Sequence, residues 1–401
     1  MIRRVFKAFE YRDFRLMWIG ACTSTIGTWM QIVAQSWLIY TLTNSATMLA
    51  LDQVLGGLPL LLFSLVGGVV ADRIDRRYAL LASQYVQMSS AFILTALVAT
   101  HSVHVWQILT LSFVNGCAQS IGGPAYAALI PTLVEKDDMP NAIALNSIQF
   151  NLAVTIGPAL GGVALHNLGM SWCFGLNGVS FLAPIIALGM LHTRFLPQPT
   201  GESILDSMKQ GFRFVRKQGA MEILIVLAFL MTFLAVPART FLPVFAKQIF
   251  HRGSETYAAF LSVTGAGSIL GALAVAGLGN VGNKGKVALT MLVCLGASMA
   301  GFAVSTSLWI SYVALFLFGG ALIAVFAMVS SLVQLIVTNE MRGRVMSVYN
   351  TAFRGGMGVG NLLTGWLVPR FTAPIVLGVN GLLLIAVALY FLFVQRRVAE
   401  L

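Results

Sequence analysis

Charged residues are scarce in this chain of 401 residues. Only 10% are Asp, Glu, Lys or Arg, whereas 58% are hydrophobic. A water-soluble globular domain needs about a quarter of its residues charged, so the shortage excludes that class. Apolar windows of about 20 residues recur from Phe14 to Phe393. This is the length that an α-helix needs to cross the hydrocarbon of a bilayer.

The groups that carry most enzyme chemistry are also sparse. The four cysteines lie within apolar windows without metal-ligand spacing, which favours small core residues. The five histidines lie at window ends or in loops, and no Ser/His/Asp constellation sits at a shared depth. No G-x-x-x-x-G-K-[ST] phosphate loop is present. We therefore expect no enzyme activity, no cofactor and no metal, with energy taken from a gradient or from a substrate.

The net charge of +11 has a topological explanation. Five basic residues precede the first apolar window, and twenty of the 25 Lys and Arg fall on the cytoplasmic side if the N-terminus is inside. This positive-inside bias fixes orientation and an even number of spans. It predicts a multi-pass protein of the bacterial inner membrane with both termini cytoplasmic. It also removes the need for a nucleic-acid partner.

The apolar windows predict about twelve transmembrane helices in an all-α membrane protein. The expected spans are 14–40, 47–71, 78–100, 105–129, 141–166 and 172–191, then 220–246, 256–279, 286–305, 308–337, 345–368 and 373–395. We expect an N-terminal six-helix bundle at 1–191 and a C-terminal one at 220–401. The polar stretch 192–219 between them predicts a cytoplasmic linker with an amphipathic helix on the membrane surface.

The two halves also resemble each other. A shift of 203 residues without a gap aligns five pairs of identical residues: Gly116 with Gly319, Leu129 with Leu332, Val134 with Val337, Gly157 with Gly360 and Gly162 with Gly365. Such self-similarity is expected after duplication of a six-helix unit, and transporters place their site where such halves meet.

The loop after the second expected helix reads Gly68-Val-Val-Ala-Asp72-Arg73-Ile-Asp75-Arg76-Arg77. It resembles the G-x-x-x-D-R-x-G-R-R/K signature of the major facilitator superfamily, with Asp75 where the pattern usually has Gly. The resemblance implies two pseudo-symmetric six-helix bundles that work by alternating access. It also implies a conformational switch in which Asp72 meets basic residues before helix eleven. The switch set is then Gly68, Asp72, Arg73, Arg76, Arg77, Arg342 and Arg344. The alternative is a solvated turn that only sets topology.

Helix five carries Gly157-Pro158-Ala-Leu-Gly161-Gly162. It resembles the G-P-x-x-G-G motif of exporters and antiporters in the superfamily, with Ala153 in place of the upstream Gly. Plain packing against a neighbouring helix is the alternative, because small residues let helices approach closely. The stretches 124–131 and 342–347 resemble the bacterial efflux branch that includes macrolide and enterobactin exporters.

Ionisable residues within hydrocarbon are functional candidates because they are costly there. The candidates here are Asp52, Arg239 and Arg354. Helices two and eleven are neighbours in the superfamily, and spacing along them leaves roughly 9 Å of height between Asp52 and Arg354. We therefore hypothesise an ion pair that forms in one state of the transport cycle. Helix one has no acid between Leu16 and Tyr40, which leaves Asp52 as the candidate proton carrier. The alternatives are that Asp52 faces outside water and that Arg354 binds backbone carbonyls.

Helices one, four, seven and ten line the central cavity in this superfamily. The residues expected to line it here are Gln31, Gln35, Asn115, Gln119, Phe233, Arg239 and Phe326. The amide pairs four residues apart share a helix face, and interhelical hydrogen bonding is their alternative role. Amides and aromatic rings with few charges suit a bulky amphiphilic substrate.

Three transport classes remain open. The first is export of a drug, siderophore or metabolite, by proton antiport. The second is proton-coupled nutrient uptake, and the third is a lipid or lysolipid flippase. A sensor built on the same fold is the alternative from a different class. We expect a monomer whose partners are a small-molecule substrate, protons and membrane lipid.

Overall fold

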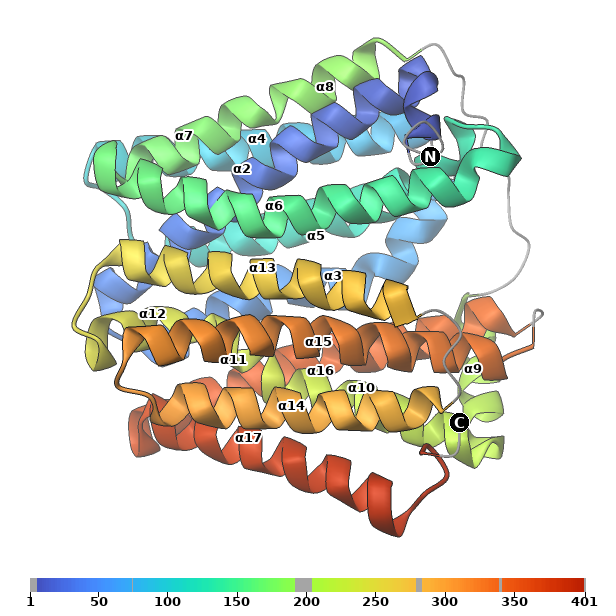
Figure 1. Ribbon diagram of the computed structural model, residues 1–401. Coiled ribbons are helices and arrows are strands. Elements are labelled where there is room, and N and C mark those ends of the chain that lie inside the picture. Colours follow the sequence, from blue (N-terminus) through green and yellow to red (C-terminus); the bar gives the residue numbers. More distant parts are fainter. Residues whose placement is uncertain (1–5, 74, 192–203, 279–282, 339–340, 400–401) are drawn as a thin grey trace. The chain divides into compact units, whose positions relative to one another are not determined.

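The computed structural model describes residues 6–73, 75–191, 204–278, 283–338 and 341–399, and nearly all of these lie in helices (Figure 1). The chain divides into two compact units. The first comprises Met1–Asn44 and Leu55–Gly201, and the second comprises Ser45–Val54 and Glu202–Leu401. The second unit therefore includes the linker helix and the first residues of α3.

The helices of the first unit follow the expected spans closely. After the short 3-10 helix η1 (Lys7–Glu10) come α2 (Arg12–Thr43), α3 (Ala46–Arg73), α4 (Arg76–Ala99), α5 (Val105–Leu129), η2 (Ile130–Thr132), η3 (Lys136–Asp138), α6 (Met139–Asn167), α7 (Met170–Ser180) and α8 (Leu182–Gly189). The sixth expected span is thus two collinear helices that meet at Phe181.

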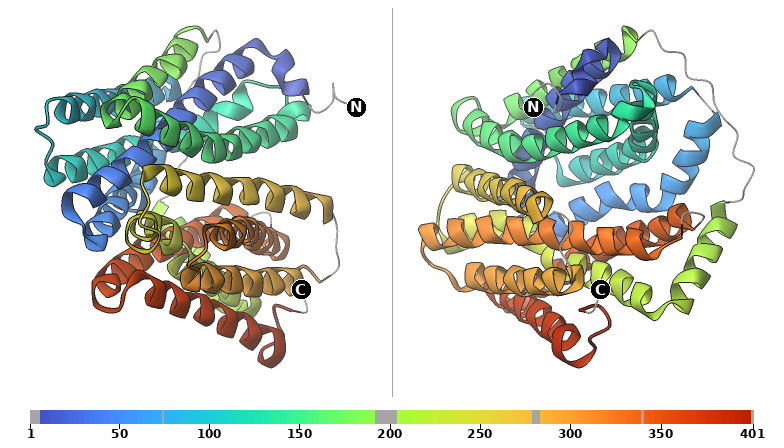
Figure 2. Two further views of the ribbon diagram at one scale, coloured as in Figure 1. Left: turned by 60° about the vertical axis from the view of Figure 1, so that its left-hand side comes forward. Right: turned by 45° about the vertical axis from the view of Figure 1, so that its right-hand side comes forward.

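The second unit begins with the linker helix α9 (Ile204–Lys217). It continues with α10 (Gly219–Ala235), α11 (Pro237–Thr240), α12 (Leu242–Val244), the π-helix η4 (Phe245–Ile249), α13 (Ser254–Leu278), α14 (Lys284–Val304), α15 (Leu308–Ile336), α16 (Arg342–Phe371), α17 (Ala373–Leu389) and the π-helix η5 (Tyr390–Val394). The seventh expected span breaks after Ala235 because Pro237 and Pro243 each remove a helix hydrogen bond. In every view of Figures 1 and 2, α14 lies beside α17.

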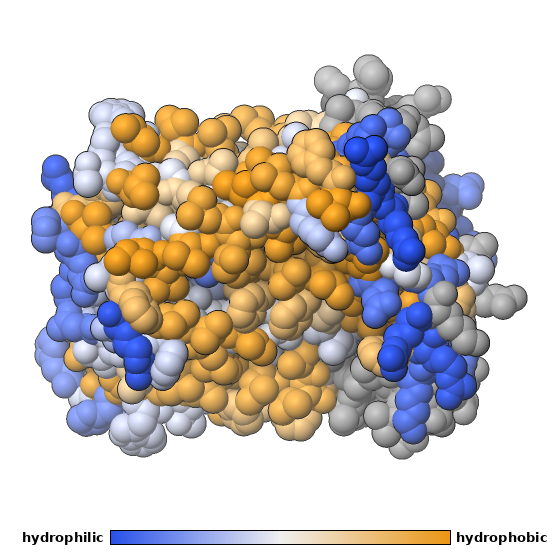
Figure 3. Space-filling model, turned by 90° about the horizontal axis from the view of Figure 1, so that it is seen from below, coloured by the Kyte–Doolittle hydropathy of each residue, from blue (hydrophilic) through white to orange (hydrophobic). Residues whose placement is uncertain are grey.

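Nine of the described helical segments are long and apolar enough to cross a membrane. They begin at Ala46, Arg76, Lys136, Met170, Gly219, Ser254, Lys284, Leu308 and Ala373. The face drawn in Figure 3 has an apolar band flanked by hydrophilic residues at both ends. Such a band matches a hydrocarbon layer between two polar interfaces.

Glycines pair the helices in the same way in both units. A Cβ on Gly157 of α6 would lie 2.8 Å from the Ile26 carbonyl oxygen of α2. The corresponding Gly360 of α16 meets the Phe233 carbonyl of α10. Each glycine therefore allows direct contact between two helix backbones. This contact is the packing role expected as the alternative for the Gly157-Pro158 motif.

A second repeat pair behaves likewise. Gly116 of α5 meets the Gly56 carbonyl of α3, and Gly319 of α15 meets the Thr264 carbonyl of α13. The aligned glycines thus hold equivalent helix pairs together in the two halves. Their self-similarity in sequence corresponds to a repeated packing scheme.

The N-terminal segment is tied to the start of α6. Lys7 Nζ lies 2.8 Å from Asp138 Oδ1, and the Tyr11 hydroxyl donates to Asp138 Oδ2 at 2.8 Å. The Ala8 amide donates to Asn141 Oδ1 at 2.9 Å. The hydrogen bond from Lys7 to Asp138, and then the charge of that carboxylate, raises the pKa of the Lys7 ammonium. These bonds fix the start of α2 against the start of α6.

The helix α3 crosses the division between the units four residues before its proline. Pro59 lies inside α3 and has no N–H to donate to the carbonyl of Leu55, four residues earlier. Leu55 is also the first α3 residue that belongs to the first unit. The division therefore falls where the helix lacks one of its internal hydrogen bonds.

The packing at Gly360 generates a test with a matched control. Gly360→Ala should destabilise the protein by about 1–3 kcal/mol, because the new methyl group overpacks the contact with Phe233. Gly358→Ala, two residues earlier in α16, meets nothing within 4 Å and should keep or raise stability, since Ala favours a helix over Gly. Thermal unfolding of both purified variants in detergent measures the difference. Equal midpoints would contradict the packing role.

Candidate functional site

Three long helices do not reach the hydropathy of the nine membrane candidates. These are α2 with 32 residues, α5 with 25 and α16 with 30. They also carry most of the polar residues that the sequence assigned to a cavity or gate: Gln31, Gln35, Asn115, Gln119 and Arg354. Helices that line a polar path need less apolar surface than helices surrounded by lipid.

A chain of side-chain hydrogen bonds crosses the first unit. Asn177 Nδ2 of α7 donates to Gln31 Oε1 of α2 at 2.7 Å. Gln31 Nε2 donates to Gln35 Oε1 at 3.3 Å, and Gln35 Nε2 donates to Ser112 Oγ of α5 at 2.9 Å. The chain links three helices. Gln31 and Gln35 therefore form hydrogen bonds between helices in this structure. This is the alternative role that the sequence analysis considered for them.

Asn177 was not among the functional residues predicted from the sequence, although the sequence contained a signal for it. It is a single amide in the apolar span 172–191, and its side chain is 2% exposed. A buried amide in hydrocarbon needs a partner. The partner is Gln31, 146 residues away along the chain, which spacing within one helix does not show.

The second amide pair lies differently. Asn115 Oδ1 is buried and, among the described residues, no donor reaches it. Gln119, one turn further along α5, is exposed and receives only a long hydrogen bond of 3.5 Å from Gln87 Nε2 of α4. A buried acceptor without a donor costs about 1–3 kcal/mol. Such a cost is characteristic of sites that complete their hydrogen bonding with a ligand or water.

Aromatic rings surround the predicted residues of the second unit. Phe233 stacks on Phe229 of α10 with centroids 5.8 Å apart. Phe326 of α15 lies 5.0 Å from Phe353 and 6.4 Å from Tyr349, both on α16. Arg239 is half-buried in the short helix α11, where the prolines interrupt the span.

The start of α3 packs on α16. Thr47 Oγ1 donates to the Gly365 carbonyl oxygen at 2.8 Å. A Cβ on Gly365 would contact the Ala50 side chain and lie 3.5 Å from Thr47 Cα. Gly365 is aligned with Gly162 by the repeat and here provides the close approach between these two helices.

Asp52 and Arg354 do not form an ion pair in this structure. Asp52 is 4% exposed, whereas Arg354 is exposed. Arg354 precedes Gly365 by eleven residues on α16, and Asp52 follows Ala50 by two on the antiparallel α3. At 1.5 Å per residue these offsets leave about 13 Å of height between them, more than the roughly 9 Å expected. The ion pair remains a prediction for another state of the transport cycle.

The structure describes only part of the motif at residues 68–77. Gly68, Asp72 and Arg73 belong to α3 by backbone, but their side chains lie outside the described residues. Arg76 Nη1 donates to the Ala128 carbonyl at the end of α5 at 3.1 Å. Arg77 Nη2 donates to the Gly189 carbonyl at the end of α8 at 2.9 Å. These arginines therefore tie helix ends within the first unit.

Asp75, which departs from the superfamily pattern, caps a helix. Its Oδ1 accepts from the Arg77 amide at 2.9 Å at the N-terminus of α4. An Asp at this position satisfies an amide that the helix leaves free and favours the positive end of its dipole. The expected partners of Asp72 sit in the first turn of α16. Arg342 is exposed, and Arg344 is half-buried with Nη1 3.6 Å from Met341 Sδ.

The fold resembles solved transporters. A POT family transporter in complex with 5-aminolevulinic acid superposes with a TM-score of 0.78, covering 96% of each chain at 11% identity. The nucleoside transporter NupG gives a TM-score of 0.72, covering 95% of this chain and 98% of its own, at 14% identity. At these identities the likeness shows the fold alone.

Curated relatives align over most of the chain. The enterobactin exporter EntS of Shigella boydii is 27% identical, covering 96% of this chain and 92% of the relative. The multidrug efflux pump Tap of Mycolicibacterium fortuitum is 24% identical, covering 87% and 88%. The transmembrane secretion effector model matches residues 5–401. The chain therefore belongs to the transmembrane secretion effector family of the major facilitator superfamily and is a transport protein, not an enzyme.

Proposed function

We propose that this protein exports a small amphiphilic molecule, a siderophore or a drug, across the bacterial inner membrane by alternating access. The observation that carries the proposal is the amide pair Asn115 and Gln119 on α5, a long helix that is not among the nine apolar segments. Asn115 offers a buried acceptor, and the exposed amide of Gln119, one turn along the same helix, is a donor and acceptor for hydroxyl groups. The names of relatives, with enterobactin export and multidrug efflux among them, support the same class.

The proposal includes twelve spans, both termini in the cytoplasm and a monomer. The two helices α2 and α5 and the helix α16 complete the count beyond the nine apolar segments. Their lower hydropathy is consistent with a polar path that faces substrate instead of lipid.

Alternating access would use α3 as a shared element. Its first residues pack on α16 at Gly365, and the rest belongs to the first unit. Opening of the outer side would separate Thr47 from Gly365, and the interruption at Pro59 would absorb the bend. The cytoplasmic Asp72 and the basic start of α16 would hold the opposite side closed.

Proton antiport would use Asp52. Among the predicted acids it is the one within the apolar part of a span, and it is buried near the contact between α3 and α16. A carboxyl group in that position binds and releases a proton as its access to water changes. Pairing with Arg354 in the alternate state would favour the ionised form.

Two Asn variants separate binding from packing. Asn177→Leu should lower the free energy of unfolding by about 1–3 kcal/mol, because it leaves the buried Gln31 carbonyl oxygen without its donor. Asn115→Leu removes an acceptor that has no donor and should leave stability unchanged or higher, while it weakens transport. Thermal unfolding and transport in proteoliposomes measure the two effects. Normal transport by a folded Asn115→Leu protein would contradict the cavity assignment.

The antiport proposal is tested by accumulation in an efflux-deficient bacterium. Cells that express the protein should accumulate less of one compound from a panel of dyes, macrolides and catecholate siderophores, and an uncoupler should abolish the effect. Asp52→Asn and Arg354→Gln should each lose at least about tenfold in export, which corresponds to about 1.4 kcal/mol, with normal membrane insertion. Full export by both variants would exclude their coupling role. No change across the panel would favour lipid transport or uptake.

A crosslink tests the outer contact. In a variant without the four native cysteines, Thr47→Cys with Gly365→Cys should form a disulfide, because the positions are close enough for one. Oxidation should stop transport, and a reductant should restore it. Each single Cys variant is the control and should be insensitive to oxidation. Unchanged transport by the fully crosslinked protein would show that the contact does not open during the cycle.

A further inference from the structure

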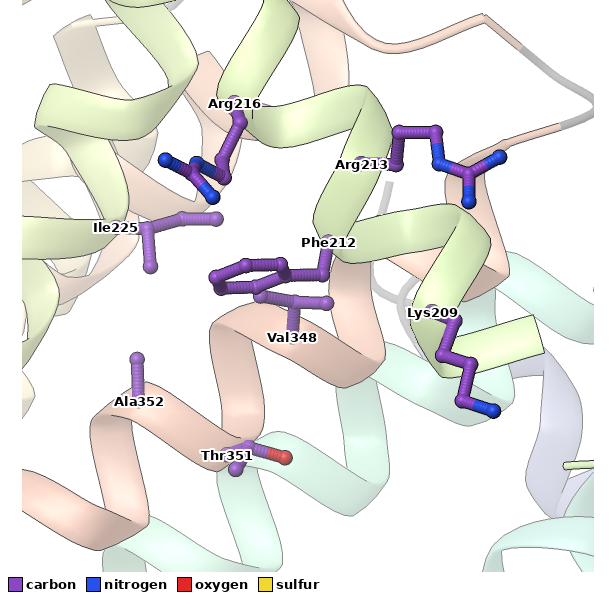
Figure 4. A pocket seen from close by; sticks show the side chains of 8 residues that line it. All are labelled: Lys209, Phe212, Arg213, Arg216, Ile225, Val348, Thr351 and Ala352. Carbon is purple, nitrogen blue, oxygen red and sulfur yellow. The ribbon is translucent and has the colours of Figure 1, made fainter. Parts of the chain in front are cut away.

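A groove lies at the junction of α9, α10 and α16 within the second unit. Its volume is about 780 Å³, and it is lined by Lys209, Phe212, Arg213, Arg216, Ile225, Val348, Thr351 and Ala352. None of the transport steps above uses these residues. Figure 4 shows Phe212 and Arg216 reaching toward α10 and α16, while Lys209 and Arg213 extend from the other side of α9.

The groove is strongly basic. Lys209, Arg213 and Arg216 lie at intervals of four and three residues, which places them on neighbouring turns of α9. No acidic side chain is among the described residues that line the groove. Within the described chain, neither Arg213 nor Arg216 takes part in an ion pair, and Arg216 lies over the Phe212 ring at 5.9 Å. The charge of these two arginines is therefore available to an external anion.

The opposite wall is apolar. Ile225 comes from α10, and Val348 and Ala352 come from α16, while Phe212 of α9 is 55% exposed beside them. A soluble phosphate or nucleotide gains nothing from this wall. An acyl chain does, because each CH₂ group buried against this wall leaves water.

The groove also lies at the depth of a lipid head group. Arg216 precedes the apolar segment Gly219–Ile249 by three residues. The linker is cytoplasmic by its charge, and the cytoplasmic leaflet carries the anionic lipids that basic segments attract. The groove therefore presents cations at the interface and apolar side chains directly below it.

The position of α9 is fixed by packing. A Cβ on Gly211 would lie 2.6 Å from the Arg344 carbonyl oxygen in the first turn of α16. The α9 backbone thus contacts α16 directly, and Val215 is buried at 3% exposure. The basic residues are held on a docked helix, so a ligand binds them without first ordering the linker.

We propose that this groove binds one anionic phospholipid of the inner leaflet. Its phosphate contacts Arg216, whose side chain faces the apolar wall, while Arg213 and Lys209 on the same helix add positive charge beside the groove. An acyl chain lies along Phe212, Ile225 and Val348. The lipid would then join the linker helix to α10 and α16. This inference goes beyond export, because it concerns a lipid that remains bound and is not carried.

The test uses full-length protein purified in detergent. Binding of dioleoyl phosphatidylglycerol is measured by native mass spectrometry and by thermal stabilisation, with dioleoyl phosphatidylcholine as the neutral lipid and glycerol 3-phosphate as the soluble anion. We expect phosphatidylglycerol alone to bind and stabilise. Arg213→Gln with Arg216→Gln should bind it about 30-fold more weakly, since each basic residue contributes about 1 kcal/mol.

Three further variants test whether binding depends on the position of the charges, on the charge itself and on the apolar contact. Lys286→Gln with Arg396→Gln removes two exposed cations outside the groove and should bind like the wild type. Arg213→Lys with Arg216→Lys keeps the charge and should retain most of the binding. Phe212→Ala should weaken lipid binding through the lost apolar contact. Equal binding of phosphatidylcholine, equal stabilisation by glycerol 3-phosphate, or unchanged binding by the Arg→Gln double variant would each overturn the proposal.

Discussion

Direct contact between helix backbones at glycine is the constraint on which both units depend. Lipid surrounds the helices, so burial of apolar side chains from water cannot drive their association. Dispersion contacts and backbone approach must replace that driving force, and a side chain at the contact would prevent it. Gly157 against Ile26 and Gly360 against Phe233 show the same solution in each half. The paired helices α2 with α6 and α10 with α16 are then rigid enough to hold polar groups in place.

Polar residues in these bundles divide into two kinds. Gln31 and Gln35 are committed to Asn177 and Ser112 and hold helices together. Asn115 has no donor in the described structure, and Gln119 is exposed. Both pairs are amides four residues apart, so their chemistry alone does not separate a structural role from a binding role. The separation comes from whether a partner helix presents a complementary group.

Features that depend on one helix alone could be predicted from the sequence, whereas features that depend on a partner helix could not. Helix positions followed from apolar length, and the repeat aligned glycines whose equivalent packing became apparent only in the structure. The departure of Asp75 from the superfamily pattern was visible, but its role as the cap of α4 depended on where that helix begins. The separation of Asp52 from Arg354 depended on how α3 packs against α16 at Gly365. Asn177 and the basic groove depended on contacts between distant segments, which local spacing does not encode.

The proline in α3 has a consequence for where this helix bends. The carbonyl of Leu55 lacks its usual helix donor, and it lies inside a segment apolar enough for hydrocarbon. Bending there breaks fewer hydrogen bonds than bending elsewhere, so α3 bends most easily at this point. The same carbonyl must be shielded from lipid throughout, because an exposed polar group there is costly. The surroundings of a few residues of α3 therefore have two effects, since they set how easily the helix bends and they keep a polar carbonyl group away from the hydrocarbon.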